Sequence, residues 1–228
     1  MKVFVLVLLL LSAAGSAAAQ TRFNPALKRE LDSIYAVDQK WRSMLFDRRI
    51  SRRPDSLAAA LGVAKERLGQ YIGRRMQQTD SANIIRVRAI LKQYGYPGKS
   101  LVGERTNEAA WYVIQHSDDI KHYLPLVKKA AQRGELPFRL YAQMLDRQLM
   151  REGKEQLYGT QAMGYSPTNP ATGQRESQPP FVWPIKDAAG VNARRQKAGF
   201  STTVEQNAAT LGIPYRVLTL KDVARMPK

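Results

Sequence analysis

The chain has 228 residues, 44% of them hydrophobic and 24% charged, which is typical of a folded globular protein and excludes a disordered chain. It contains no cysteine, so disulfide bonds, thiol nucleophiles and cysteine-ligated metals are excluded. Lysine and arginine number 36 against 19 aspartates and glutamates, and the resulting net charge of +17 favours anionic partners.

The first nineteen residues follow the order of a secretory signal peptide. Lys2 gives a positive start, residues 3–11 are an unbroken apolar run, and residues 17–19 form an A-x-A cleavage site. The apolar run is too short for a membrane span, which needs about 20 residues, and polar residues interrupt every later apolar stretch. We therefore expect cleavage after Ala19 and an exported, periplasmic or extracellular protein, with no transmembrane segment and no cysteine for a lipid anchor.

The mature chain opens with a predicted helix over residues 25–47, for which Asn24 is a suitable N-cap. Side chains that recur every three or four residues form a stripe that faces the core. The stripe consists of Leu27, Leu31, Ile34, Asp38, Trp41 and Leu45. Two further helices are predicted over residues 54–78 and 81–94, with Asp80 as the cap of the second.

The second half of the chain combines helical patterns with a short extended pair. Helices are predicted near residues 106–116, 120–133, 137–151, 187–197 and 201–211. Residues 156–163 alternate in polarity as a strand does, with 181–185 as the partner strand and a long loop at about 166–180 between them. The predicted fold class is mainly α: a multi-helix globule with one small β-hairpin or two-stranded sheet near residues 156–185.

We expect one mainly helical domain over residues 20–228, after a signal peptide at 1–19. No internal repeat is visible, which favours one domain over an array. Residues 48–78 are basic and rich in alanine, and we interpret them as a basic helical insertion. The loop at about 166–180 is long for a compact domain, which favours a mobile segment or a functional flap.

Asp38 is the one charged residue in the stripe of the first helix. A carboxylate at a core-facing position must be paired or hydrogen-bonded, because the burial of a lone charge is costly. Arg42 lies one turn along the same face and can pair with it. The alternatives are a buried structural tie between helices and a carboxylate that lines a polar pocket in the helical core.

His116 stands where the predicted helix at 106–116 ends. With Asp118 or Asp119 it could form a base and its orienting carboxylate, bind a metal, or make local capping bonds. The chain has one other histidine, His122, and no ligand spacing typical of a zinc site. We therefore predict no metal and no cofactor.

Asp146 and Arg147 are neighbours on the predicted helix over residues 137–151. Adjacent helical residues point about 100° apart, so the two side chains serve different partners. Arg147 can grip a carboxylate or phosphate with two hydrogen bonds, or it can form an ion pair between helices.

Several short motifs occur in order along the chain. They are Asp38-Gln39-x-x-Arg42, Asp80-x-x-Asn83, Tyr94-Gly95-Tyr96-Pro97-Gly98, Ser100-Leu101-Val102-Gly103-Glu104, Ala110-Trp111, Gln115-His116-x-Asp118, Asp146-Arg147 and Gln156-x-Tyr158-Gly159-Thr160-Gln161. Together they resemble an uncharacterised bacterial family, domain of unknown function 6624, over about residues 27–200. The basic segment at 48–78 departs from the usual pattern of that family.

The resemblance implies no reaction, because the family has no assigned activity. It does imply that polar positions on several helices and a strand belong to one pattern and can converge on one pocket. The candidate catalytic residues are His116, Asp38 and Asp146. The candidate ligand-binding residues are Gln39, Arg42, Gln115, Asp118, Arg147, Tyr158 and Gln161.

Three interpretations of function follow. The first is an exported protein of unknown function with a polar pocket that binds a small or anionic ligand; its residues are Asp38, His116, Asp146, Arg147 and Gln161. The second is a hydrolase- or lyase-type enzyme with His116 as general acid or base. The third is a basic binding or structural module that meets anionic envelope polymer or lipid head groups; its residues are Arg48, Arg49, Arg52, Arg53, Arg74 and Arg75. Nucleic acid is disfavoured, because no basic stripe interleaved with aromatic residues is present.

Overall fold

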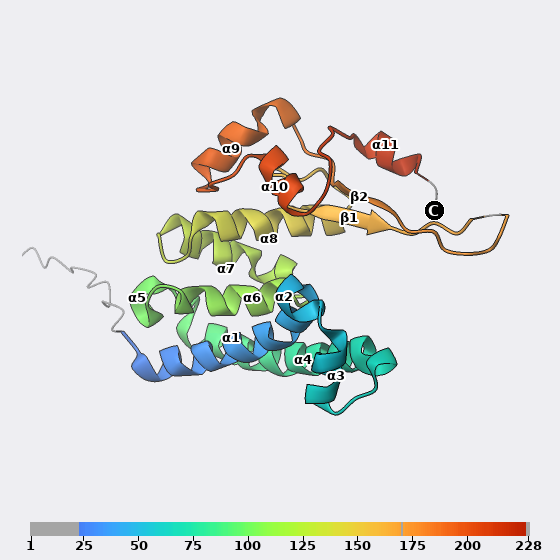
Figure 1. The fold of residues 1–228 in the computed structure, drawn as a ribbon. Helices are drawn as coiled ribbons and strands as arrows, with labels where there is room; N and C mark the ends of the chain where they lie inside the picture. The colour runs from blue at the N-terminus through green and yellow to red at the C-terminus, as the bar shows by residue number, and fades with distance from the viewer. Residues whose placement is uncertain (1–22, 170, 227–228) are drawn as a thin grey trace, which may run out of the picture.

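The computed structural model describes residues 23–169 and 171–226, and the predicted signal peptide lies outside them. Within these residues the chain is mainly helical with one two-stranded antiparallel sheet, which confirms the predicted fold class (Figure 1). No helix in this part of the chain is both long and apolar enough to cross a membrane.

Helix α1 (Pro25–Phe46) begins as predicted, with the Asn24 side chain accepting a hydrogen bond from the Leu27 amide. Its stripe packs against α4 (Leu68–Tyr94) and α6 (Ala109–Gln115). The stripe residues that become fully buried are Leu27, Leu31, Asp38 and Trp41. The packing of α1 thus carries one carboxylate into the interior.

Helix α4 is continuous from Leu68 to Tyr94, so the predicted boundary at Asp80 is wrong. Asp80 lies in mid-helix, and its carboxylate accepts hydrogen bonds from Arg42 of α1 instead of capping a new helix. The polar, turn-favouring residues around Asp80 mark only a weak local preference, which packing against α1 outweighs. The predicted helix at 54–78 is also divided, into α2 (Arg48–Ser51), α3 (Pro54–Leu61), the 3-10 turn η1 (Lys65–Arg67) and the start of α4.

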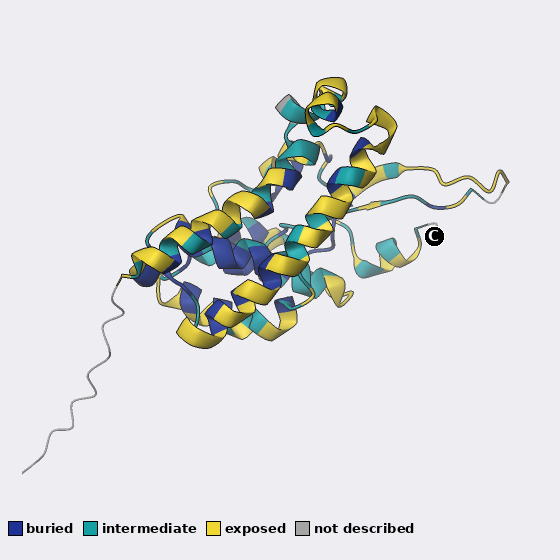
Figure 2. Cartoon of the chain, turned by 90° about the horizontal axis from the view of Figure 1, so that it is seen from below, coloured by how far each residue is buried: buried dark blue, intermediate teal, exposed yellow. Residues whose placement is uncertain are grey.

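The middle of the chain forms the main core. Its elements are α5 (Lys99–Val102), the 3-10 turn η2 (Thr106–Glu108), α6, α7 (Ile120–Gln132) and α8 (Phe138–Arg151). The short helix α6 is central and almost wholly buried, with Trp111 and Ile114 packed among side chains of α4, α7 and α8. Figure 2 shows the buried residues between the helices and the exposed residues on their outer faces.

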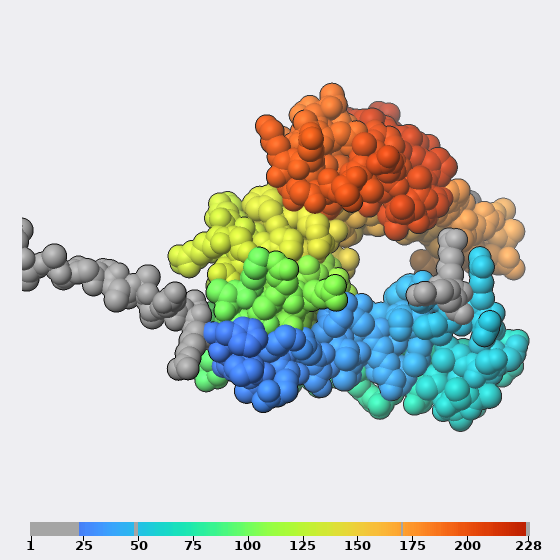
Figure 3. All heavy atoms as spheres, turned by 60° about the vertical axis from the view of Figure 1, so that its left-hand side comes forward, coloured from blue at the N-terminus to red at the C-terminus, as the bar shows by residue number. Residues whose placement is uncertain are grey.

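The C-terminal part forms a separate layer over α8 (Figure 1). The strands β1 (Ala162–Tyr165) and β2 (Gln178–Val182) pair antiparallel, with Ala162 opposite Val182. The remaining elements are η3 (Ala188–Gly190), α9 (Val191–Lys197), α10 (Val204–Thr210) and α11 (Leu220–Ala224). Figure 3 shows the molecule hollowed between the N-terminal helices and this layer.

The hairpin differs in register from the prediction. Residues 156–161, which were expected to be strand, are an irregular segment, and β1 begins only at Ala162. The partner strand ends at Val182, and Ile185 only bridges to Gln156. The alternating pattern at 156–163 is misleading because its polar side chains bond inward: the buried Gln156 donates to the carbonyls of Gln161 and Trp183.

Candidate functional site

Asp38 is fully buried on α1, and its carboxylate is held by three side chains. Gln39 donates to Oδ2 at 2.7 Å, and Arg42 donates to Oδ1 at 3.1 Å. The Nδ1 atom of His116 lies 3.3 Å from Oδ1. Arg42 also donates to the Asp38 backbone carbonyl at 2.9 Å, which fixes the position of its guanidinium beside the carboxylate.

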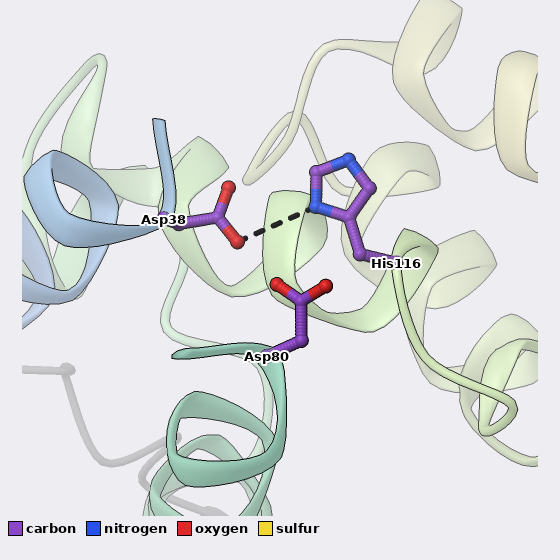
Figure 4. A group of neighbouring side chains, drawn as sticks. All are labelled: Asp38, Asp80 and His116. Atoms are coloured by element: carbon purple, nitrogen blue, oxygen red, sulfur yellow. Dashed lines mark hydrogen bonds and ion pairs between the residues drawn. The ribbon is translucent and has the colours of Figure 1, made fainter. Parts of the chain in front are cut away.

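His116 follows the last residue of α6, and the buried helix brings its imidazole to Asp38 (Figure 4). Because an ionised carboxylate can only accept, this contact places the proton of the neutral ring on Nδ1. Nε2 then keeps its lone pair, and it points away from both carboxylates in Figure 4. Within the described residues, Nε2 has no hydrogen-bond partner. The contact of Nδ1 with Asp38 therefore fixes the orientation of the ring, and Nε2 is left available to a ligand.

Arg42 links the two carboxylates of the site. One amino group of its guanidinium contacts Asp38, and the other donates to both oxygens of Asp80, each at 2.8 Å. Arg42 thus supplies the positive charge that the burial of Asp38 requires.

One turn along α4 from Asp80, the buried amide nitrogen of Asn83 has no hydrogen-bond partner in the part of the chain that the structure describes.

Asp38, Asp80 and His116 could also hold a metal ion, because one donor atom from each lies within 4.8 Å of the others (Figure 4). Carboxylate and imidazole donors suit divalent transition metals. However, the Arg42 guanidinium already donates to both carboxylates, so a divalent cation would have to displace it. The donor set therefore fits a metal less well than the residue types alone suggest.

Two arginines of α8 approach the backbone carbonyls of the residues that precede and follow His116. Arg147 approaches the Gln115 carbonyl at 3.5 Å, and Arg151 donates to the Ser117 carbonyl at 3.0 Å. Burial lowers the pKa of the Arg147 guanidinium, and the charges of Arg151 and Arg42 lower it further. Among residues 23–169 and 171–226, Arg147 has no carboxylate partner. It is therefore a half-buried cation whose charge no described carboxylate offsets directly.

A groove of about 470 Å³ opens beside this cluster, between α4 and the turn that joins α6 to α7. Its lining includes Met76, Asp80, Ile84, Arg88, His116 and Asp118. The exposed Asp118 lies at its edge, and Asp119 is paired with Arg88. The groove gives a small polar molecule access to the side of His116.

Asp146 lies in a different environment on α8. It is fully buried, and it accepts hydrogen bonds from the backbone amides of Leu157, Tyr158 and Thr160 at 2.7–3.1 Å and from the Thr160 hydroxyl at 2.9 Å. Burial raises the pKa of the Asp146 carboxyl, while the three amides and the hydroxyl oppose this shift. Asp146 anchors the segment before β1 to α8.

The structure therefore divides the predicted site residues into two groups. Asp38, Gln39, Arg42, Gln115, His116, Asp118 and Arg147 gather around the end of α6. Asp146, Tyr158 and Gln161 belong to the anchored segment, where Gln161 donates to the Thr160 hydroxyl. No hydrogen bond between described residues joins the second group to Asp38 or His116.

Sequence reasoning did not select Asp80, Asn83 or Arg151 as site residues. The sequence pattern predicts Asp80 as a helix cap, although its i+3 spacing to Asn83 indicates that both residues share one face of a helix. Arg151 carried no sequence signal, because it acts on the carbonyl of Ser117, 34 positions away.

Comparison with known proteins places the chain in a family but gives no activity. The model of a family of unknown function (DUF6624) matches residues 64–211, more than half of the chain, so the chain belongs to that family. The resemblance drawn from the motifs is thereby confirmed, whereas α1 with Asp38 lies before the matched residues. No curated protein and no solved structure matches the chain.

Proposed function

We propose that this member of the family binds a small anionic ligand beside His116 and exchanges a proton with it, as a hydrolase or lyase does. The observation that carries the proposal is the contact between His116 Nδ1 and the fully buried Asp38 carboxylate, which leaves Nε2 open. In this arrangement Nε2 takes a proton from water or from the ligand and returns it to the leaving group. Asp38 stabilises the imidazolium in between and is a positioning residue.

Charge supports an anionic ligand. Arg42 offsets one of the two negative charges of Asp38 and Asp80, and Arg147 adds a second cation nearby that lacks a carboxylate partner in the described structure. A carboxylate or phosphate between Arg147 and His116 would satisfy that charge with charge-assisted hydrogen bonds. The fixed cation is also suited to stabilise charge that develops in a transition state.

Nitrogen NMR of the imidazole tests the proton placement. In the protein with labelled histidine, we expect neutral His116 to carry its proton on Nδ1, and we expect Asp38→Ala to shift the proton towards Nε2. The exposed His122 serves as the internal reference, and His122→Gln assigns the signals. A wild-type His116 with its proton on Nε2 would contradict the proposed orientation.

Binding and turnover test the function itself. Inorganic phosphate and acetate should shift the His116 signals in the wild type and much less in Arg147→Gln. Hydrolysis of nitrophenyl phosphate, sulfate and carboxylate esters should fall by about 10²-fold or more in His116→Ala and stay unchanged in His122→Ala. Equal rates in the two variants, or no response to either anion, would refute the proposal. Stimulation by Zn²⁺ or Mn²⁺ that requires Asp80 would favour the metal site instead.

We also propose that the chain is exported, on the strength of residues 1–19 alone. The mature protein should then begin at Gln20. Intact mass of the protein recovered from the periplasm or medium of a bacterial host tests this, and an uncleaved chain retained in the cytoplasm would contradict it.

A further inference from the structure

The segment between α1 and the middle of α4 forms a projection with a small core of its own, at the end of the helical layer away from the start of α1 (Figure 1). We call it the basic tip; it comprises α2, α3, η1 and the first turns of α4, residues 48–76. Its buried core consists of Ala58, Leu68 and Ile72 together with Trp41 of α1. Arg75 and Lys40 lie against the Trp41 ring, at 5.2 and 4.9 Å from its centroid. The tip is thus firmly joined to α1.

The charge of the basic tip is strongly positive. Residues 48–76 include eight lysines and arginines but only two acidic residues, Asp55 and Glu66. Lys65 pairs with Asp55, whereas several exposed arginines have no carboxylate partner within the described residues. These are Arg52, Arg53, Arg67 and Arg74. Unpaired surface cations at such density attract an anionic surface.

An exposed aromatic side chain lies just before this basic segment in the sequence. Phe46, the last residue of α1, is 73% exposed and is the most exposed large hydrophobic side chain in the described part of the chain. It stands two residues before the first arginine of the tip. A dissolved acidic polymer attracts the arginines but has no apolar region into which the Phe46 ring can insert. The interface of a bilayer attracts the arginines and also takes up apolar side chains. The combination therefore fits a lipid surface better than a dissolved polymer.

We infer that the basic tip docks on the surface of an anionic lipid bilayer, with its arginines at the phosphate head groups and Phe46 inserted at the interface. The attraction falls off within a Debye length, so it weakens as salt increases. The apolar contact of Phe46 persists at high salt. This inference is independent of the reaction proposed at His116.

Co-sedimentation with vesicles tests the inference, using the chain from Gln20 onward with the same N-terminus in every variant. The wild type should bind phosphatidylcholine vesicles only when they contain phosphatidylglycerol. The double variant Arg52→Glu/Arg53→Glu should lose roughly twentyfold or more in affinity, since each basic residue near the surface contributes about fivefold. Phe46→Ser should weaken the residual binding that remains at high salt.

Matched variants separate the tip from general charge and exposure. Lys128→Glu/Lys129→Glu makes the same charge change at two adjacent exposed lysines of α7, and Ile85→Ser removes a side chain that is 67% exposed on α4. Both should bind vesicles nearly as the wild type does. Equal losses in tip and control variants would overturn the inference. Binding to dissolved polyphosphate without binding to vesicles, or an unchanged Phe46→Ser, would also overturn it.

Discussion

Asp38 and Asp146 are both fully buried, yet their carboxylates meet different kinds of partner. Asp146 is surrounded by backbone amides and one hydroxyl of a single segment. Asp38 is surrounded by side chains from α1 and by His116, and His116 in turn lines a groove. Backbone amides fix the course of the chain, whereas a side chain with one free nitrogen can act on a ligand. Burial of a carboxylate therefore does not by itself distinguish an anchor from a site.

Replacement of Asp146 should have the largest effect on stability. Asp146→Ala leaves three amides without their acceptor, so we expect a loss of about 3–5 kcal/mol in the free energy of unfolding, measured by urea denaturation. Amide hydrogen exchange should increase first at Leu157, Tyr158 and Thr160. Asp38→Asn is the control: it keeps the shape of the buried side chain and one acceptor, and should lose clearly less. Equal losses of unfolding free energy in the two variants would contradict the assignment of Asp146 as the structural anchor and of Asp38 as a site residue.

Gly159 extends the test to the segment that Asp146 anchors. Its φ is +65°, and a Cβ there would stand 2.5 Å from Val204 Cγ2 and 2.8 Å from Ile185 Cδ1. Backbone strain and overpacking together should cost about 2–4 kcal/mol in Gly159→Ala. Gly153 has a φ of +68° and open space around it, so Gly153→Ala should cost only the strain, about 1 kcal/mol. Similar midpoints for the two variants would show that the segment does not pack tightly on the C-terminal layer.

Arg147 should give the smallest change in stability. Arg147→Gln removes a half-buried cation that faces like charges and contacts only a carbonyl, so the free energy of unfolding should change by about 0.5 kcal/mol or less. The urea midpoint measures this. A loss as large as that of Asp146→Ala would identify Arg147 as a structural tie and remove it from the ligand site.

Patterns local to one helix predicted structure well. The N-cap at Asn24 and the stripe of α1 were readable because both depend on residues within a few turns of each other. The break at Asp80 was predicted wrongly because its partner, Arg42, is 38 residues away. The strand at 156–163 was misplaced for a similar reason, since Gln156 bonds to Trp183. Contacts across the fold decided both cases.

The candidate site followed the same rule. The stripe of α1 indicated that Asp38 would be buried, and Arg42 one turn on was recognisable as its partner. The contact with His116 spans 78 positions, and no spacing in the sequence could specify it. The family pattern includes Asp146 beside these residues, but no hydrogen bond between described residues joins Asp146 to Asp38 or His116. Motifs show which residues occur in the same sequences and do not show which side chains are in contact.

Helix α4 connects the basic tip to the groove and so fixes the orientation of one relative to the other. It runs unbroken from Leu68, in the core of the basic tip, to Asp80 at the groove, a separation of about 18 Å at about 1.5 Å per residue. Because the helix is unbroken, it fixes both the distance between its two ends and their relative orientation. A tip held against a surface would therefore hold the mouth of the groove at a fixed height and angle above that surface, and α4 would act as a rigid spacer between attachment and chemistry.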